Sequence, residues 1–178
     1  MTHEILLAGF GGQGILFAGK ILAYSGLMDE KEVSWLPSYG PEMRGGTCNC
    51  SVCISDDPIG SPLVLDPSIL VVMNTPSMEK FAGSVKPGGV IISDSTMVDV
   101  KTDRTDIKAF YIPATELAQK NDLAGGANII LLGKLFRETG IVSAETFKKA
   151  VEKVVPAKKA ALAANNLKAV QIGMDYEG

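Results

Sequence analysis

The sequence predicts an α/β fold: a single domain with a Rossmann-like parallel sheet, covering helices and a smaller antiparallel β layer, which together make three layers. A short apolar run at residues 5–8 leads directly into a glycine-rich stretch and then into apolar residues, the pattern of strand, tight turn and helix. Further apolar runs alternate with helical stretches, as in parallel sheets. Residues 47–65 leave no room for a crossover helix, so they predict an antiparallel pair.

Composition limits the classes of function. The 178 residues are 46% apolar and 21% charged, which predicts one globular domain over residues 1–178. A net charge of −3 provides no basic field, so we expect no nucleic acid partner. The N-terminus lacks a basic region, and no uncharged apolar stretch reaches about 18 residues. We therefore expect no membrane span and a cytoplasmic location.

Residues 9–14 read Gly-Phe-Gly-Gly-Gln-Gly, a Gly-x-Gly-x-x-Gly motif between a strand and a helix. Glycine permits backbone angles closed to other residues and lets a ligand approach the main chain. The N-terminus of the following helix offers free N–H groups and a partial positive charge. The motif therefore predicts a seat for phosphate or pyrophosphate. Lys20, the only charge on that helix, can extend into solvent or reach back to an anion.

Three interpretations of the motif stay open. A classical NAD or FAD site requires an acidic residue about 20 positions on, at the end of the second strand. Asp29 and Glu30 come too early, and the tip of the second apolar run (33–36) carries Pro37 and Ser38 instead. The glycines can also form a tight turn that binds nothing. A different phosphate-bearing ligand is the favoured interpretation.

Residues 37–46 form a ten-residue loop with three glycines and two prolines, so several backbone angles are fixed by residue type. Rigid loops at strand ends commonly carry function in α/β proteins. We therefore interpret the loop as a functional site, the alternative being a structural turn whose charged residues face water. Its candidate residues are Ser38, Tyr39, Gly40, Pro41, Glu42, Arg44, Gly45 and Gly46.

Three cysteines, Cys48, Cys50 and Cys53, invite a metal-site hypothesis, but His3 is the only histidine and there is no fourth cysteine. On a strand, Cys48 and Cys50 face one side and Cys53 the other. We interpret them as buried small hydrophobic residues and expect no metal site. His3 precedes the first strand, at the wrong end for an α/β site, so no catalytic dyad and no catalytic residue is expected in this chain.

The remaining elements follow from local signals. The first helix (14–25) is predicted to end at Gly26, and a helix at 75–81 to be capped by Thr75. Continuous apolar runs predict central strands at 69–73 and 90–93, and a further strand is expected at 108–112. The antiparallel pair comprises strand 47–55 and a return strand at 63–65. Asp94 is interpreted as the cap of the next turn.

The C-terminal third is predicted to be helical. Pro113 opens a helix to about 120, and an apolar helix (127–139) ends at Gly140. Asn128 either caps that helix, which is the favoured interpretation, or points its amide into a site. Ser143 caps the following helix, and the last helix runs from about 156 to 172.

Together these motifs resemble the gamma subunit of 2-oxoacid:ferredoxin oxidoreductases. The resemblance rests on the glycine motif at 9–14 and on the Ser-Tyr-Gly-Pro-Glu-x-Arg-Gly-Gly loop at 38–46. Residues 54–59, the Pro-Gly-Gly turn at 87–89, residues 112–114 and Asn128 also resemble that family. The similarity covers nearly the whole chain.

The resemblance implies a multi-subunit enzyme that oxidatively decarboxylates a 2-oxoacid to an acyl-coenzyme A and reduces ferredoxin. It places thiamine diphosphate, Mg²⁺ and iron–sulfur clusters on partner alpha and beta, possibly delta, subunits. This chain would help to bind coenzyme A, whose diphosphate suits a glycine loop. The predicted cofactor-binding residues are Gly9, Gly11, Gly12, Gln13, Gly14 and Lys20. The loop 38–46, with Asn128, would face the catalytic subunits.

The resemblance leaves the 2-oxoacid open, although a separate single-domain chain favours the 2-oxoglutarate or branched-chain types. The alternative functions are a stand-alone NAD- or FAD-binding dehydrogenase and a purely structural docking subunit.

Overall fold

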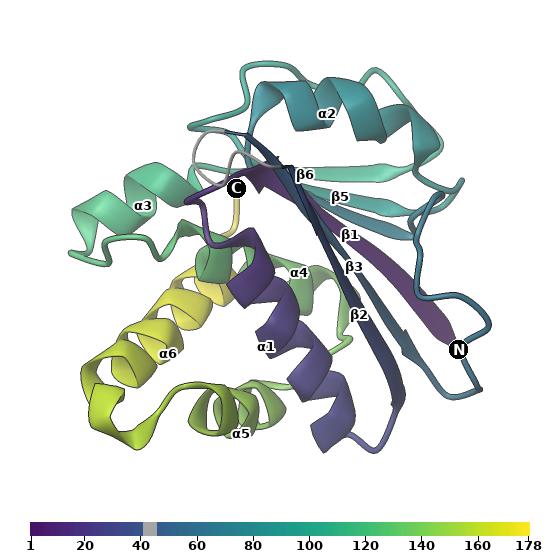
Figure 1. The fold of residues 1–178 in the computed structure, drawn as a ribbon. Coiled ribbons are helices and arrows are strands. Elements are labelled where there is room, and N and C mark those ends of the chain that lie inside the picture. Colours follow the sequence, from purple (N-terminus) through teal and green to yellow (C-terminus); the bar gives the residue numbers. More distant parts are fainter. Residues whose placement is uncertain (41–45) are drawn as a thin grey trace.

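The computed structural model describes residues 1–40 and 46–178 and is built on a six-stranded mixed sheet with the order β2-β3-β1-β4-β5-β6 (Figure 1). The strands are β1 (Thr2–Phe10), β2 (Glu32–Tyr39), β3 (Thr47–Ser55), β4 (Ile69–Val72), β5 (Val90–Asp94) and β6 (Lys108–Ile112). Strands β1, β4, β5 and β6 pair in parallel, whereas β3 pairs antiparallel with both β1 and β2. The predicted α/β fold is confirmed, and its antiparallel part continues the parallel sheet across β1.

Helices cover both faces of this sheet. They are α1 (Ile15–Met28), α2 (Thr75–Phe81), α3 (Ala114–Lys120), α4 (Ala127–Thr139), α5 (Ala144–Val154) and α6 (Ala160–Asp175), with short 3₁₀ segments at Ala82–Ser84 and Ala157–Lys159. Helix α2 lies on one face, and α1, α4, α5 and α6 lie on the other (Figure 1). Within the described residues, no helix has both the length and the apolar character that crossing a membrane requires.

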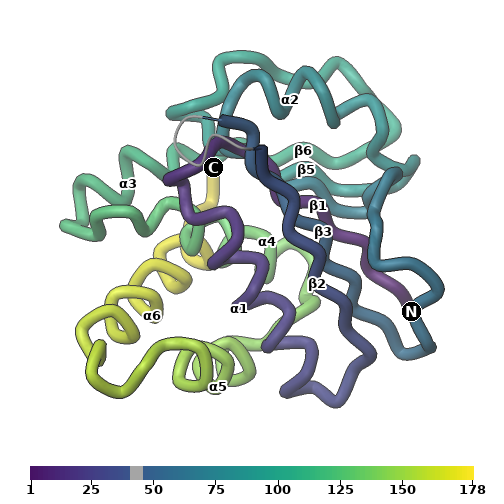
Figure 2. Tube along the Cα trace, in the orientation of Figure 1, coloured from purple at the N-terminus to yellow at the C-terminus, as the bar shows by residue number. Residues whose placement is uncertain are grey.

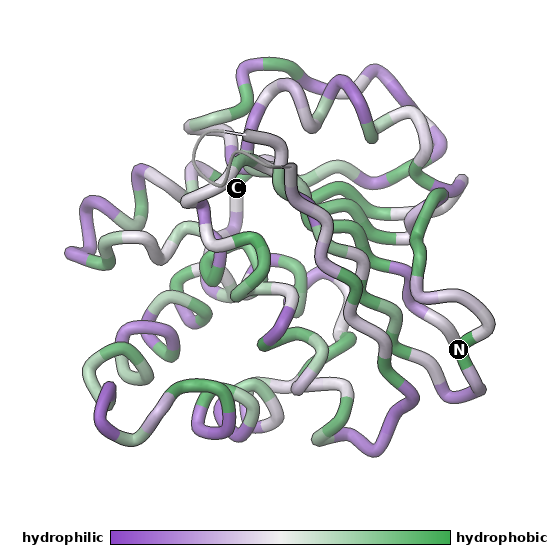
Figure 3. The backbone as a smooth tube through the Cα atoms, in the orientation of Figure 1, coloured by the Kyte–Doolittle hydropathy of each residue, from purple (hydrophilic) through white to green (hydrophobic). Residues whose placement is uncertain are grey.

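Strand β1 divides the core between these two faces. Ile5 and Leu7 belong to the larger apolar cluster, on the side of α1 and α4, and Leu6 belongs to the smaller one beneath α2. This follows from the alternation of side chains along a strand. Because both faces are covered, the central strands are largely apolar, as the hydropathy colouring shows (Figure 3).

The predicted return strand at residues 63–65 is wrong. Both edges of β3 are already paired, one with β1 and the other with β2, so no ladder position is left for a third strand. The segment instead lies over β3, where the N–H of Val64 donates to the hydroxyl of Ser51 at 3.2 Å.

Two predicted helix ends are also corrected. Gly26 does not end the first helix, because α1 continues to Met28; a Cβ at Gly26 would lie 2.8 Å from Cγ2 of Val33, so this glycine serves close packing. Asn74 rather than Thr75 caps α2, since its side chain accepts from the Ser77 N–H at 3.0 Å.

The predictions for Gly140, Ser143 and Asp94 are confirmed. Gly140 ends α4 with a left-handed φ of 65°, and Ser143 accepts from the Thr146 N–H at the start of α5. Asp94 is fully buried and accepts from the N–H groups of Thr96 and Thr115, so it caps a turn and the start of α3.

The three cysteines are buried free thiols, as predicted. Cys48 and Cys50 lie in the larger core cluster and Cys53 in the smaller one, on opposite faces of β3. Burial raises the pKa of each thiol, and that of Cys50 to about 12. In the part of the chain that the structure describes, no three His, Cys, Asp or Glu side chains gather closely enough to hold a metal ion.

We expect iodoacetamide at neutral to mildly alkaline pH to alkylate Cys50 far more slowly in the folded chain than in guanidinium chloride. Only the thiolate reacts, and burial both covers the sulfur and keeps it protonated. Timed alkylation followed by peptide mass spectrometry measures each rate. Equal rates for Cys50 in the folded and unfolded chain would contradict the buried placement.

We expect Gly173→Ala to lower the free energy of unfolding by about 1–3 kcal/mol, the usual cost of overpacking. A Cβ at Gly173 would lie 1.9 Å from the carbonyl oxygen of Ile130, where α6 crosses α4. Urea unfolding monitored by circular dichroism measures the change. Gly83→Ala is the matched control, because a Cβ there meets no atom within 4 Å; similar losses for both variants would disprove the close crossing.

Candidate functional site

The glycine motif connects β1 to α1 at the carboxyl end of the parallel strands. The loop lies at the end of the sheet away from the N-terminus (Figure 2). On one side of β1 is the parallel strand β4 and on the other is the antiparallel strand β3, so the sheet changes direction here. Ligands of open α/β sheets bind in the crevice at such a switch point.

Three of the glycines in the motif stand where the backbone conformation or the packing favours glycine. Gly12 and Gly14 have φ values of 102° and 75°, in the left-handed region that favours glycine. Gly14 is also the N-cap of α1 and carries no capping side chain. Gly9 permits a close approach, since a Cβ there would lie 2.3 Å from Oε1 of Gln13.

Not every backbone N–H group of the glycine loop is free to bind a ligand, so the prediction that Gly11 and Gln13 bind phosphate through their N–H groups is corrected. The Gly11 N–H donates to the Gly46 carbonyl at 2.9 Å, and the Gln13 N–H donates to the Phe10 carbonyl at 3.2 Å. These two groups are already used within the chain. Among the described residues, no acceptor is found for the N–H groups of Gly12, Gly14 and residues 15–17 of α1. Any anion seat therefore lies at the start of α1.

Two side-chain amides hold the loop from opposite sides. Gln13 accepts from the Phe10 N–H at 2.9 Å and donates to the Met73 carbonyl at 2.7 Å. Asn128, only 4% exposed, donates from Nδ2 to the Gly14 carbonyl at 2.9 Å. The favoured interpretation of Asn128 as a helix cap is wrong, because Gly126 occupies the N-cap of α4. Both side chains brace the loop.

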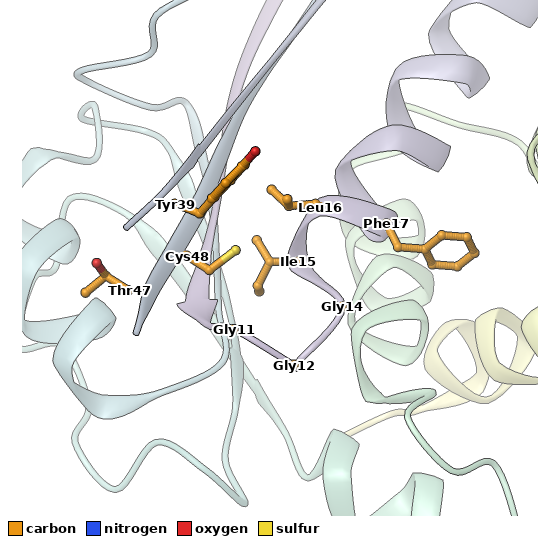
Figure 4. A pocket seen from close by; sticks show the side chains of 9 residues that line it. All are labelled: Gly11, Gly12, Gly14, Ile15, Leu16, Phe17, Tyr39, Thr47 and Cys48. Atoms are coloured by element: carbon orange, nitrogen blue, oxygen red, sulfur yellow. The ribbon is translucent and has the colours of Figure 1, made fainter. Parts of the chain in front are cut away.

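A cavity of about 290 Å³ opens beside the loop, and we call it the α1 cavity. Its lining residues are Gly11, Gly12, Gly14, Ile15, Leu16, Phe17, Tyr39, Thr47 and Cys48 (Figure 4). Tyr39 and Cys48 stand across from Ile15 and Leu16, while the Phe17 ring points away from them (Figure 4). Burial raises the pKa of Cys48, so its thiol stays protonated at neutral pH. The lining carries no charged side chain, so the backbone N–H groups and the N-terminal end of α1 are the polar groups that can attract an anion here.

Two further cavities of about 240 Å³ each adjoin the same loop. The α3 cavity is lined by Phe10, Gly12, Gln13, Met73, Met97, Thr115, Ala118, Gln119, Leu123, Ala124, Gly125 and Ala127. The α6 cavity is lined by Gly14, Phe17, Leu123, Ala124, Gly125, Gly126, Asn128, Leu162, Asn165 and Asn166. The glycine loop thus contributes lining residues to all three cavities.

Other predicted site residues lie farther from the loop. Lys20 is exposed on α1 and lines none of the three cavities that the described residues form. Ser38, on the edge strand β2, pairs with Asn49 of β3, so the predicted loop begins within this strand. Gly40 donates its N–H to the Thr47 carbonyl at 3.3 Å.

The rest of the predicted loop cannot be placed. Pro41, Glu42, Met43, Arg44 and Gly45 lie outside the described residues.

The sheet order argues against a dinucleotide site. Strand β3 lies between β1 and β2, so the tip of β2 is two strand spacings, about 10 Å, from the glycine loop. Asp29 lies at the far end of α1, where it accepts from the Thr146 hydroxyl at 2.8 Å. Neither position can supply the acid that holds a dinucleotide ribose.

The site residues predicted from the sequence do not include three parts of the chain that line the cavities: Phe17, Cys48 and the turn 123–126. A signal for the turn was present, because Gly125 and Gly126 precede an apolar helix just as the motif glycines precede α1. Cys48 had been assigned to the core, which is correct, but it also lines the α1 cavity.

Comparisons with known proteins agree with this fold. The family model described as pyruvate ferredoxin/flavodoxin oxidoreductase matches residues 4–176. The 2-oxoglutarate synthase subunit KorC of Methanocaldococcus jannaschii is 43% identical over 88% of this chain and 85% of its own length. The ketoisovalerate oxidoreductase subunit VorA of Methanothermobacter thermautotrophicus is 38% identical over 97% of this chain. The chain spans only 36% of the length of VorA.

Two solved structures share the fold. The gamma subunit of keto/oxoacid ferredoxin oxidoreductase from Geobacter sulfurreducens superposes with a TM-score of 0.81 at 32% identity, covering 97% of this chain and 96% of its own. The 2-oxoglutarate:ferredoxin oxidoreductase of Magnetococcus marinus gives a TM-score of 0.85 at 24% identity, covering 97% of this chain and 30% of its own. The glycine loop, the sheet and these matches agree, and the chain belongs to the pyruvate ferredoxin/flavodoxin oxidoreductase family, as a relative of its gamma subunits.

Proposed function

We propose that this chain is the gamma-type subunit of a 2-oxoacid:ferredoxin oxidoreductase and that its glycine loop helps to bind coenzyme A. The observation that supports this proposal is that the N–H groups of Gly12, Gly14 and residues 15–17 have no acceptor among the described residues and border an open cavity. Such groups at a helix N-terminus bind diphosphate without a basic side chain.

The names of the relatives support the reaction class. KorC is named a subunit of 2-oxoglutarate synthase and VorA a subunit of ketoisovalerate oxidoreductase. The Magnetococcus marinus enzyme was solved with 2-oxoglutarate, coenzyme A and succinyl-coenzyme A bound. At 24% identity this likeness shows the fold alone, so the fold occurs in an enzyme that binds coenzyme A.

In this proposal the chain binds and orients the acyl carrier, and partner chains perform the redox chemistry. Thiamine diphosphate with Mg²⁺, held on alpha and beta (possibly delta) subunits, would supply the decarboxylation chemistry, and iron–sulfur clusters on those subunits would supply the electron transfer to ferredoxin. The loop amides hold the diphosphate, and the apolar walls of the α1 cavity exclude water from the carrier. We propose that Ser38, Tyr39 and the following loop face the catalytic subunits.

We expect Gly12→Asp to raise the KM for coenzyme A of the assembled enzyme by on the order of tenfold relative to Gly12→Asn. Both side chains have the same size and meet the same strain at φ 102°, and a Cβ at this position meets no atom within 4 Å. Only Asp places a negative charge beside the diphosphate. Reduction of a low-potential viologen at varied coenzyme A measures the KM. Equal values for Asp and Asn would favour the alternative of a structural docking subunit whose loop binds nothing.

We expect the assembled enzyme to prefer 2-oxoglutarate or a branched-chain 2-oxoacid over pyruvate, and the isolated chain to be inactive. The KorC and VorA relatives motivate the first expectation, and the lack of a nucleophile–base pair predicted from the sequence motivates the second. Comparison of kcat/KM over a panel of 2-oxoacids measures the preference. A clear preference for pyruvate, or turnover by the isolated chain, would contradict it.

A further inference from the structure

The α6 cavity lies beyond Phe17 from the α1 cavity. It is bounded by Gly14 and Phe17, by the turn 123–126 and by the first half of α6. The Phe17 ring points away from Tyr39 and Cys48, the opposite wall of the α1 cavity (Figure 4). The two cavities share Gly14 and Phe17 as lining residues, so they lie next to each other at the start of α1.

A second helix N-terminus opens into the α6 cavity. Helix α4 has 13 residues and begins after Gly125, with φ 73°, and Gly126, its N-cap. Among the described residues, no acceptor is found for the N–H groups of Gly125, Ala127 and Asn128. The residues that line the cavity carry no charged side chain, so these dipoles dominate its potential.

Asn166 provides an independent indication of a ligand. It lines the cavity, is only 4% exposed, and its amide nitrogen is buried without a hydrogen-bond partner among the described residues. A buried donor without an acceptor is rare and energetically costly. Asn166 also lines the cavity, so an acceptor oxygen bound there would give this donor the partner that it lacks within the described residues.

We infer that the α6 cavity is a second oxyanion site, which receives a phosphomonoester of the same carrier whose diphosphate lies at the glycine loop. This inference rests on the proposed function. Coenzyme A carries both groups, a diphosphate and a separate ribose phosphate, and Gly14 lies between the two sites. The N-termini of α1 and α4 then each hold one phosphate, with Asn166 donating to the second.

Leu162 allows a test without disturbing the core, because it lines the cavity and is 40% exposed. In the assembled enzyme, calorimetry compares coenzyme A with 3′-dephospho-coenzyme A, which lacks the phosphomonoester. We expect the wild type to bind coenzyme A on the order of tenfold more tightly, as a charge-assisted hydrogen bond implies. Leu162→Asp should weaken and Leu162→Lys should strengthen the binding of coenzyme A, with Leu162→Asn in between. None of the three should alter the binding of the dephospho form.

In Asn166→Ala, the affinity for coenzyme A should fall towards the affinity for 3′-dephospho-coenzyme A. Urea unfolding shows whether the variant is folded. Equal binding of both ligands by the wild type overturns the inference, as does a Leu162 series that affects both ligands alike or neither. The experiments distinguish failure of the proposed glycine-loop seat from failure of the proposed second site. If Gly12→Asp weakens both ligands while the wild type binds them equally, the glycine-loop seat stands and the second site is wrong. If Gly12→Asp changes neither affinity relative to Gly12→Asn, the seat at the glycine loop is wrong.

Discussion

The hydrogen bond from Asn128 Nδ2 to the carbonyl of Gly14 is the contact on which the geometry of the site depends. That carbonyl also accepts the N–H of Ala18, the first backbone bond of α1, so a single oxygen joins α4 to the start of α1. On the opposite side, Gln13 binds the loop to the end of β4. Because α1, α4 and the end of β4 all hold the loop, its remaining N–H groups have fixed directions, and under the proposal a bound anion would not have to order them.

The position of β3 explains how a dinucleotide-like motif can serve another ligand. In a Rossmann unit, the strand after the first helix lies beside the first strand and presents an acid to the ribose. Here an antiparallel strand takes that place and contributes Cys48 to the wall of the α1 cavity. The glycine turn and the helix N-terminus of the motif are present, while an apolar surface takes the place of the acid that binds the ribose.

Local signals in the sequence predicted most of the fold, and contacts between distant residues account for the failures. The motif glycines, Gly140 and Ser143 act within a few residues, so their roles followed from the sequence. Gly26 looked like a helix end because its close contact, Val33, is on another element. The false strand at 63–65 failed for a similar reason, since only the sheet order shows that β3 is paired on both edges. The bonding of Gly11 to Gly46 and of Asn128 to Gly14 likewise depends on tertiary structure.

The crossing of α4 and α6 has a consequence for how this site can change in evolution. At Gly133 and Gly173 the two backbones touch without side chains between them, and a Cβ at either would lie about 2 Å from a carbonyl oxygen of the other helix. Helix α6 therefore cannot slide or tilt to enlarge the hollow that it borders. If the α6 cavity binds a ligand as proposed, its size and charge can be changed by substituting side chains at its mouth, such as Leu162, without moving either helix.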